Sequence, residues 1–293
     1  MDFRTDAGAR IETALEAALA HAGGEGAPPL LASAMRHAVF PGGARIRPRL
    51  ALGVAAACGD GAPGLAEAAA AAIELLHCAS LVHDDLPCFD DAATRRGKLA
   101  VHCAYGEPLA VLAGDGLIVL AFETLARAGA AAPHRLGPLV ATIAASTGMP
   151  HGIVAGQAWE SEPEIDLSRY HRAKTGALFS AATRAGALAA GGDPELWRPL
   201  GELLGEAYQV ADDLHDIASS ADEIGKPTGQ DAAHGRASAA ALLGIDGAID
   251  RLEALVADAI ASIPACAGAS ELRAVIRAAS ARFVPKSLAR VAA

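Results

Sequence analysis

The sequence predicts an all-α protein, folded as a helical bundle. Of its 293 residues, 52% are hydrophobic and only 4% are aromatic, and alanine is abundant. Alanine and leucine favour helices, whereas strands prefer β-branched and aromatic residues. A chain of this length can bury a large core. No low-complexity linker or charge block divides it, so we predict a single domain over residues 1–293.

The predicted helices of the first half have apolar residues at helical spacing and are bounded by glycine or proline. They span residues 10–21, 30–39, 50–57 and 63–82. The last is nearly all Ala, Leu, Ile and Glu, which predicts a long buried helix. Pro87 should end it and place Asp90 and Asp91 on the following turn. His102 and Tyr105 then belong to the next loop.

The second half continues this pattern. Its predicted helices span residues 108–128, 132–146, an Ala/Leu-rich segment that ends at 190, and 195–217. Glycine and proline interrupt the pattern between 148 and 157, and a polar stretch follows. Residues 217–237 are rich in Gly, Pro and Asp and contain Lys226 and Arg236, which predicts a flap carrying cations. Short helices broken at 244–247, 264–268 and 285 complete the chain.

Charge and cysteine content narrow the class of protein. The net charge of -10 argues against a nucleic-acid-binding surface, so we expect no nucleic-acid partner. Five cysteines without a CxxC pair suit reduced thiols in the cytoplasm. The charged N-terminus predicts no signal peptide. The most apolar stretch, 109–120, is interrupted by Asp115, so we expect no membrane span.

A cluster of carboxylates follows the long helix that ends near residue 82. Asp84, Asp85, Asp90 and Asp91 lie within eight positions and are followed by the Arg95-Arg96-Gly97 sequence. Like charges this close repel one another unless a cation lies between them. The simplest candidate is a divalent metal ion.

A second acidic cluster occurs in the helix predicted at 195–217. Asp212 and Asp216 are four residues apart, which places both carboxylates on one helix face, with Asp213 beside them. One such cluster alone is more often a solvated helix end. Two clusters of oxygen ligands, each followed by basic residues, instead favour Mg²⁺ bound to a diphosphate.

Basic residues could hold the phosphates of such a substrate. Arg45, Arg47 and Arg49 follow two glycines at the start of a helical run, which fits either a phosphate clamp or a solvated basic turn. Lys174 alone could simply extend to water. With the acidic clusters, the cations become complementary to phosphate: Arg45, Arg47, Arg95, Arg96, Lys174, Lys226 and Arg236. The apolar helices around them suggest a hydrocarbon substrate.

Together these segments resemble the trans-prenyltransferases, the polyprenyl (isoprenyl) diphosphate synthases, over most of the chain. Residues 84–97 resemble the first Asp-rich motif in its DDxxxxD form, and 212–216 resemble the second. The other matching segments are Gly42 to Pro48 (GGKRxRP), Gly156-Gln157, Lys174-Thr175, Tyr208-Gln209 and Gly225-Lys226-Pro227. The chain is most similar to the bacterial geranylgeranyl diphosphate synthases of carotenoid-type pathways.

The resemblance implies the isoprenoid synthase fold, an all-α bundle around a deep central cavity, usually in a homodimer. It implies condensation of isopentenyl diphosphate with an allylic diphosphate, using about three Mg²⁺ ions per active site. The implied metal ligands are Asp84, Asp90 and Asp212, supported by Asp85 and Asp216. The implied ligands of the allylic diphosphate are Arg95, Lys174 and Lys226, and those of isopentenyl diphosphate are Arg45, Arg47, His77 and Arg96. Thr175 and Gln209 would turn oxygen dipoles toward a carbocation.

Product length should depend on the residues just upstream of Asp84. Ala79 and Ser80 are small, which by resemblance predicts a C20 product, geranylgeranyl diphosphate, with farnesyl diphosphate (C15) as the alternative. Leu76, Leu117 and Phe122 are candidates for the cavity floor.

Two positions depart from the family pattern. Ala44 replaces a lysine of GGKRxRP, and Gln230 replaces a common second lysine of the flap. Each loss would cost about 1 to 3 kcal/mol of binding if uncompensated. The acidic motifs are intact, so we expect an active enzyme, with a noncatalytic partner subunit as the lesser alternative. Two other classes of enzyme fit the motifs less well. An HD-type phosphohydrolase would leave the second acidic cluster unexplained. A terpene cyclase would not need the second set of arginines, which would bind a second diphosphate.

Overall fold

The computed structural model describes residues 3–218, 239–281, 283 and 284. Its described residues are almost entirely helical, and their only strands form one short hairpin. They divide into two compact units, described separately here. Unit 1 comprises residues 1–143 and 185–192, and unit 2 comprises 144–184 and 193–293. The all-α fold class predicted from composition is confirmed.

Unit 1 contains the first helices and the hairpin. Its elements are α1 (Phe3–Ala22), α2 (Pro29–Val39), α3 (Ile46–Ala57), α4 (Pro63–Asp84), β1 (Thr94–Arg95), β2 (Lys98–Leu99), α5 (Val101–Tyr105) and α6 (Glu107–Gly129). The first part of α7 (Pro133–Thr147) and the end of α10 (Ala177–Ala190) also belong to it. The four helices predicted before residue 85 are all present. His102 and Tyr105, which we expected in a loop, lie in the short helix α5.

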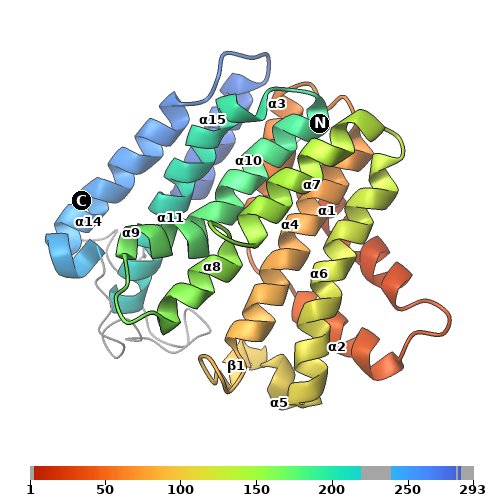
Figure 1. Cartoon of the computed structure of the whole chain (residues 1–293). Helices are drawn as coiled ribbons and strands as arrows, with labels where there is room; N and C mark the ends of the chain where they lie inside the picture. Colours follow the sequence, from red (N-terminus) through yellow and green to blue (C-terminus); the bar gives the residue numbers. More distant parts are fainter. Residues whose placement is uncertain (1–2, 219–238, 282, 285–293) are drawn as a thin grey trace. The chain divides into compact units, whose positions relative to one another are not determined.

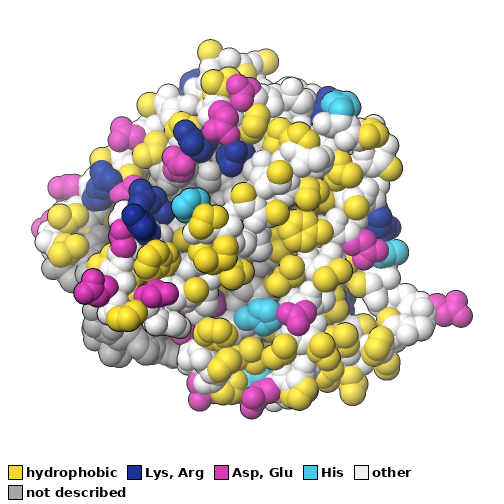
Figure 2. Space-filling model, viewed as in Figure 1, with side chains coloured by type: hydrophobic (Ala, Val, Ile, Leu, Met, Phe, Trp, Pro, Cys, Tyr) yellow, Lys and Arg dark blue, Asp and Glu magenta, His cyan; other side chains and the backbone are white. Residues whose placement is uncertain are grey.

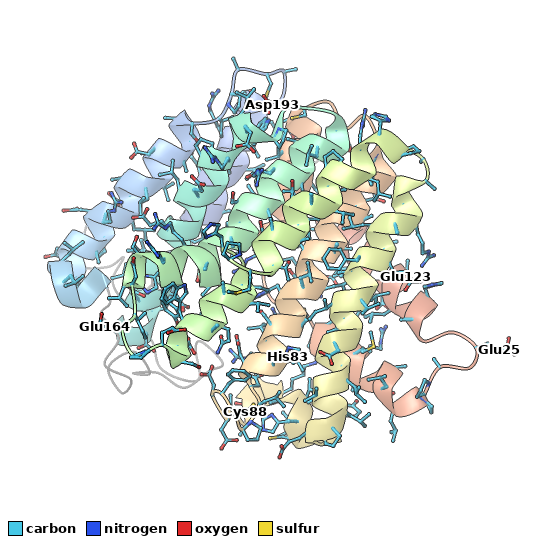
Figure 3. The ribbon with its side chains drawn as sticks, viewed as in Figure 1. Glu25, His83, Cys88, Glu123, Glu164 and Asp193 are labelled. Carbon is cyan, nitrogen blue, oxygen red and sulfur yellow. The ribbon has the colours of Figure 1, made fainter. Side chains whose placement is uncertain are left out.

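Helix α4 forms the centre of unit 1. Its residues from Ala68 to Leu76 are buried, and it packs most extensively against α6 and then against α3 and α1 (Figure 1). His83, near the end of α4, lies between α4 and α6, where its Nε2 is 3.4 Å from the Val111 carbonyl oxygen (Figure 3). The buried helix therefore carries its C-terminal aspartates to one end of the α4–α6 pair.

Unit 2 is also helical where it is described. Its elements are α8 (Ile153–Ala158), η1 (Trp159–Ser161), α9 (Leu167–His171), the π-helix η2 (Arg172–Gly176), the first part of α10, η3 (Pro194–Trp197), α11 (Arg198–Ala218), α14 (Ala239–Ala261) and α15 (Ala269–Ser280). Helices α11 and α14 pack side by side (Figure 1). Phe179, Tyr208 and Phe283 form a row of ring contacts at 5.3 and 6.0 Å.

Two details of unit 2 differ from the sequence expectations or sharpen them. Residues 153–158, expected to interrupt the helical pattern, form α8. The break expected at 244–247 is a kink within α14, where Gly244 has a φ of 72°.

Among the described residues, two helices are long and apolar enough to cross a membrane by length and composition alone. They are α4 and α6, and the apolar stretch 109–120 lies within α6. Helix α4 is mostly buried, as the core helix of a folded domain would be. Helix α6 is less than half buried. Figure 2 shows many hydrophobic side chains on the viewed surface.

Candidate active site

The first acidic motif forms a compact turn at the end of α4. The Asp90 backbone N–H donates to the Asp84 carbonyl oxygen at 2.9 Å, and the Ala92 N–H donates to that of Asp85 at 3.2 Å. These bonds fold the chain back on the helix end, as Pro87 predicted. The Asp85 side chain is buried, whereas Asp90 is exposed. The turn therefore holds three aspartates together in different environments.

A two-residue hairpin turn returns the next segment to that cluster. Arg95 pairs with Lys98 across the β1–β2 ladder. The intervening Arg96 and Gly97 both have positive φ, 53° and 75°, which is the backbone of a type I′ turn. The side chains of the two arginines therefore point to different partners. Arg95 contacts Asp85, whereas Nη2 of Arg96 lies 4.0 Å from Oε1 of Glu74.

Arg95 and Asp85 form a close ion pair. Nε of Arg95 lies 3.0 and 3.2 Å from the two carboxylate oxygens of Asp85. Nη2 of Arg95 also contacts Oδ1 of Asp85. Burial raises the pKa of Asp85, although the hydrogen bonds and charge of Arg95 oppose that rise. Asp84 and Asp90 lie near enough to contribute to the raised pKa of Arg95. The predicted metal and diphosphate ligands of this motif are thus neighbours.

Arg45 has a different environment from the one that the sequence predicted. It donates to both carboxylate oxygens of Glu12 at 2.9 and 3.3 Å, to Glu74 at 2.7 Å and to the Val39 carbonyl at 2.9 Å. Its side chain is 3% exposed and that of Glu74 is 2% exposed. Protein groups therefore take up four hydrogen bonds of the guanidinium that we expected to hold isopentenyl diphosphate.

His77 lies one turn further along α4 than Glu74. Burial lowers its pKa well below the ordinary value of 6.5. Surrounding arginines lower it further: Arg47, Arg96, Arg95 and Arg45. His77 is therefore neutral at pH 7 and adds a hydrogen-bonding group to this basic region without adding to its charge. The structure thus brings together in unit 1 all four residues predicted to hold isopentenyl diphosphate.

The loop that carries Ala44 is anchored by a lysine from the hairpin. Nζ of Lys98 donates to the carbonyl oxygens of His37 and Phe40, at the C-terminal end of α2. A cation there complements the exposed carbonyls and the negative end of the helix dipole. Burial, together with the charge of Arg96, lowers the pKa of Lys98. Lys98 therefore joins the hairpin to the end of α2, just before the loop that carries Ala44.

The small residues upstream of Asp84 face a packed environment. Ala79 is 1% exposed. The Ser80 hydroxyl donates to the His77 carbonyl oxygen of its own helix, at 2.9 Å, so its hydrogen is already bonded. The floor candidates Leu76 and Leu117 are fully buried, and Phe122 is partly buried.

In unit 2, Lys174 is held by a half-buried acidic group. Its Nζ contacts Oε1 of Glu160, which also accepts the Tyr170 hydroxyl at 2.6 Å. Gln157 donates to the other oxygen of Glu160 at 3.0 Å. The ammonium lies 5.6 Å from the centre of the Tyr170 ring. Glu160 therefore joins two predicted segments, Gly156-Gln157 and Lys174-Thr175, in one network.

A chain of hydrogen bonds connects Thr175 to the second acidic motif. The Thr175 hydroxyl donates to Oε1 of Gln209 at 2.9 Å, and Nε2 of Gln209 donates to Asp213 at 3.0 Å. Gly205, one turn before Gln209, makes the approach possible, because a Cβ there would lie 2.8 Å from the Gly176 Cα. Asp212 and Asp216 are partly exposed on the same helix, and Asp213 is buried.

The acidic motifs suit a cation bound partly by its substrate. Within the described residues, no group of three or more His, Cys, Asp or Glu side chains is arranged to hold a metal on its own. Asp85 is held by Arg95 and Asp213 by Gln209, and other aspartates lie beside each of them in sequence, Asp84 and Asp90 in the first motif and Asp212 and Asp216 in the second. Mg²⁺ is commonly bound by one or two carboxylates, with water and substrate phosphates completing its coordination. The residues present therefore fit Mg²⁺.

Some predicted positions lie outside the described residues. They are Lys226, Gln230 and Arg236.

Comparison with known proteins identifies the family. A sequence model described as polyprenyl synthetase matches residues 28–272. The chain belongs to the polyprenyl synthetase family. This polyprenyl synthetase is 58% identical over 280 residues to a geranylgeranyl diphosphate synthase from Cereibacter sphaeroides, covering 96% of this chain and 97% of the relative. It is 52% identical over 268 residues to one from Rhodobacter capsulatus, covering 92% and 93%.

Solved structures agree with this assignment. A geranyltransferase from Helicobacter pylori, complexed with magnesium and isoprenyl diphosphate, has a TM-score of 0.81 at 30% identity and covers 95% of this chain and 97% of its own. An FPP/GFPP synthase from Zymomonas mobilis has a TM-score of 0.79 at 31% identity and covers 94% and 99%. The polyprenyl synthetase therefore has the isoprenoid synthase fold.

Sequence reasoning missed the acidic partners of the cations in this polyprenyl synthetase. They are Glu12 and Glu74 for Arg45, and Glu160 for Lys174. Sequence could have indicated Glu74, because it is a charged residue within the apolar run of α4 from Ala68 to Leu76. Asp213 was noticed as part of its motif but given no role.

Proposed function

We propose that this chain is a geranylgeranyl diphosphate synthase that condenses isopentenyl diphosphate with allylic diphosphates. The observation that carries the proposal is its 58% identity, over nearly the full length of both chains, to a curated geranylgeranyl diphosphate synthase. A farnesyl diphosphate synthase from Geobacillus stearothermophilus is 40% identical over a shorter match, 62% of this chain. These matches favour a C20 over a C15 product.

The acidic motifs hold Mg²⁺ in this proposal. Asp84, Asp90 and Asp212 are its ligands, with Asp85 and Asp216 in support, and about three ions serve each active site. Bound Mg²⁺ supplies Lewis-acid stabilisation of the diphosphate that leaves. The Asp85–Arg95 ion pair supports this arrangement, because it fixes the guanidinium beside the remaining carboxylates.

The basic residues divide between the two substrates. Arg95, Lys174 and Lys226 hold the allylic diphosphate. Arg47, Arg96 and neutral His77 hold isopentenyl diphosphate. We assign Arg45 to the support of this group, because its own hydrogen bonds are made to Glu12, Glu74 and Val39.

The reaction then requires charge separation in a dry site. The allylic C–O bond breaks and its electron pair leaves with the diphosphate, which gives an allylic carbocation. The double bond of isopentenyl diphosphate attacks that carbon to form the new C–C bond, and the resulting cation loses a proton to the released diphosphate. Thr175 and Gln209 stabilise positive charge through their oxygen dipoles, while apolar helices exclude water.

A C20 product suits the residues one to two turns before Asp84. Ala79 has a single methyl group, and the Ser80 hydroxyl is bonded within its own helix. Neither residue therefore presents bulk or an unsatisfied donor to a growing hydrocarbon chain. Leu76, Leu117 and Phe122 form the floor in this proposal.

We further propose a cytoplasmic homodimer of single-domain subunits. Both units are discontinuous in sequence, which supports one domain because neither unit is a continuous segment of the chain. The exposed apolar side of α6 supports a second copy as the partner. Its exposed residues are Val111, Leu112 and Val119.

The test is a condensation assay of the purified chain. Incubation with farnesyl diphosphate, isopentenyl diphosphate and Mg²⁺ should give geranylgeranyl diphosphate, identified by chromatography after dephosphorylation. The matched Asp84→Ala variant should lose this turnover while keeping its circular dichroism spectrum. Accumulation of C15 from shorter primers would indicate a farnesyl diphosphate synthase. No condensation by the folded wild-type chain would indicate a noncatalytic subunit, and hydrolysis or a cyclic hydrocarbon would indicate another class of enzyme.

A further inference from the structure

The chain of hydrogen bonds from Asp213 to Thr175 has a defined polarity. An ionised carboxylate only accepts hydrogen bonds, so the Gln209 group facing Asp213 is its NH₂, at 3.0 Å. The opposite side of that amide is the carbonyl oxygen, which can only accept. Thr175 therefore donates its single hydroxyl hydrogen to Gln209, at 2.9 Å.

This polarity determines what Thr175 offers to a substrate. A threonine hydroxyl has one hydrogen and two lone pairs. With its hydrogen committed to Gln209, the Thr175 oxygen presents only lone pairs elsewhere. Such a dipole stabilises a positive charge, whereas a hydroxyl turned the other way would present its hydrogen and repel that charge.

The packing around this chain restricts its rearrangement. The Asp213 side chain is buried, with the residue 3% exposed. Gly205 lies against Gly176, which keeps the Gln209 turn of α11 close to Thr175. Because Asp213 is buried and the three groups are close together, the acceptor character of residue 213 should decide which way the Gln209 amide points.

We propose that Asp213 is a positioning residue that acts through Gln209 to keep the Thr175 oxygen lone pairs directed at the developing allylic cation. This inference rests on the proposed prenyl transfer function. Asp213 itself touches no substrate. Its effect is to set the direction of a dipole two side chains away.

The Asp213→Asn variant tests this directly. Asparagine keeps the size of the side chain but can donate to the Gln209 carbonyl, which lets the amide turn over and present its NH₂ to Thr175. We expect kcat to fall about 10- to 100-fold, with the KM of both substrates within about threefold and the half-saturating Mg²⁺ concentration unchanged. Asp216→Asn is the matched control, because the same substitution at a proposed metal ligand should raise the Mg²⁺ requirement.

A double-mutant cycle distinguishes positioning from a merely structural role. In a Thr175→Val background the hydroxyl is absent, so Asp213→Asn should lower kcat by a smaller factor than it does in the wild-type chain. Multiplicative losses, or an Asp213→Asn variant with wild-type kcat, would overturn the inference. If Asp213→Asn does not fold, Gln209→Met removes the middle of the chain of hydrogen bonds, and its loss of kcat must be less than multiplicative with that of Thr175→Val. Absence of condensation by the wild-type chain would instead overturn the proposed function.

Discussion

Replacement of Arg45 separates a structural role from a substrate-binding role. In the Arg45→Met variant the hydrogen bonds to Glu12, Glu74 and Val39 are lost. Glu74 is 2% exposed, and its next cation, Arg96, lies 4.0 Å away. Removing one partner of a buried ion pair costs about 3 to 5 kcal/mol. Because Arg96 retains part of the attraction, we expect the unfolding free energy to fall by about 3 kcal/mol.

The contribution of Glu12 to this loss should be small. Its side chain is 44% exposed, and an ion pair with such a solvent-exposed partner is worth about 1 kcal/mol or less. The Arg45→Met/Glu74→Met double variant removes the buried charge as well as its partner. Replacing both members of a buried pair by apolar residues is often close to neutral, so stability should return to within about 1 kcal/mol of wild type.

Urea unfolding followed by circular dichroism measures these changes, and steady-state kinetics measure the KM for isopentenyl diphosphate. The matched control is Arg47→Met, for which we expect a raised KM and a smaller loss of stability. The reasoning would be refuted if Arg45→Met kept wild-type stability and raised that KM about tenfold. Such a result would restore Arg45 as a direct diphosphate ligand, as its sequence motif indicated.

Three other residues give predictions with separate readouts. Ala79 lies about 7.5 Å along α4 from Asp84, so Ala79→Phe should shift the product toward C15. The larger side chain should also lower the unfolding free energy by about 1 to 3 kcal/mol, because the site is packed. An unchanged C20 product from the folded variant would contradict our placement of the cavity. The depressed pKa of His77 means that the unfolded state binds its proton first as pH falls below 6.5. The unfolding free energy of the wild type should therefore drop by up to about 1.4 kcal/mol per pH unit below that value. The His77→Gln variant should lack this part of the pH dependence. Equal slopes of unfolding free energy against pH for the two proteins, measured by urea titration, would contradict the prediction. Val119 is 66% exposed on α6. Val119→Arg should convert a homodimer to monomer in light-scattering measurements, whereas Val154→Arg, also at an exposed site, should not; a dimer retained in both would indicate another interface.

Long elements were predictable from the sequence because their signals are strong and local. The helix expected at 63–82 is α4, Pro63–Asp84, since proline begins it and an unbroken run of helix-forming residues follows. Short helices were not predictable in the same way. Residues Val101–Tyr105 and Ile153–Ala158 form only one or two turns each, which is too short for a helical period to show.

In the candidate site, the residues themselves could be predicted from the sequence, but their bonding partners could not. The aspartates and arginines are identifiable from their spacing, but Arg45 bonds to Glu12 and Glu74, which are 33 and 29 positions away in the chain. Only tertiary packing selects such partners. The hairpin adds a second reason, because the adjacent Arg95 and Arg96 have different partners once the turn places Arg96 at positive φ.

In the proposed function, a protein of net charge -10 binds phosphate with cations that its own carboxylates hold in place. Arg95 is held by Asp85 and Lys174 by Glu160, so each cation is oriented by a carboxylate while its charge is largely neutralised. A cation already paired in this way attracts a bare anion less strongly than an unpaired one does. Neutral His77 fits the same pattern, since it adds a hydrogen-bonding group among arginines without adding to their mutual repulsion. The Glu160→Gln variant would separate these two effects of the carboxylate. Lys174 would be less firmly oriented, but it would attract a diphosphate with its full charge.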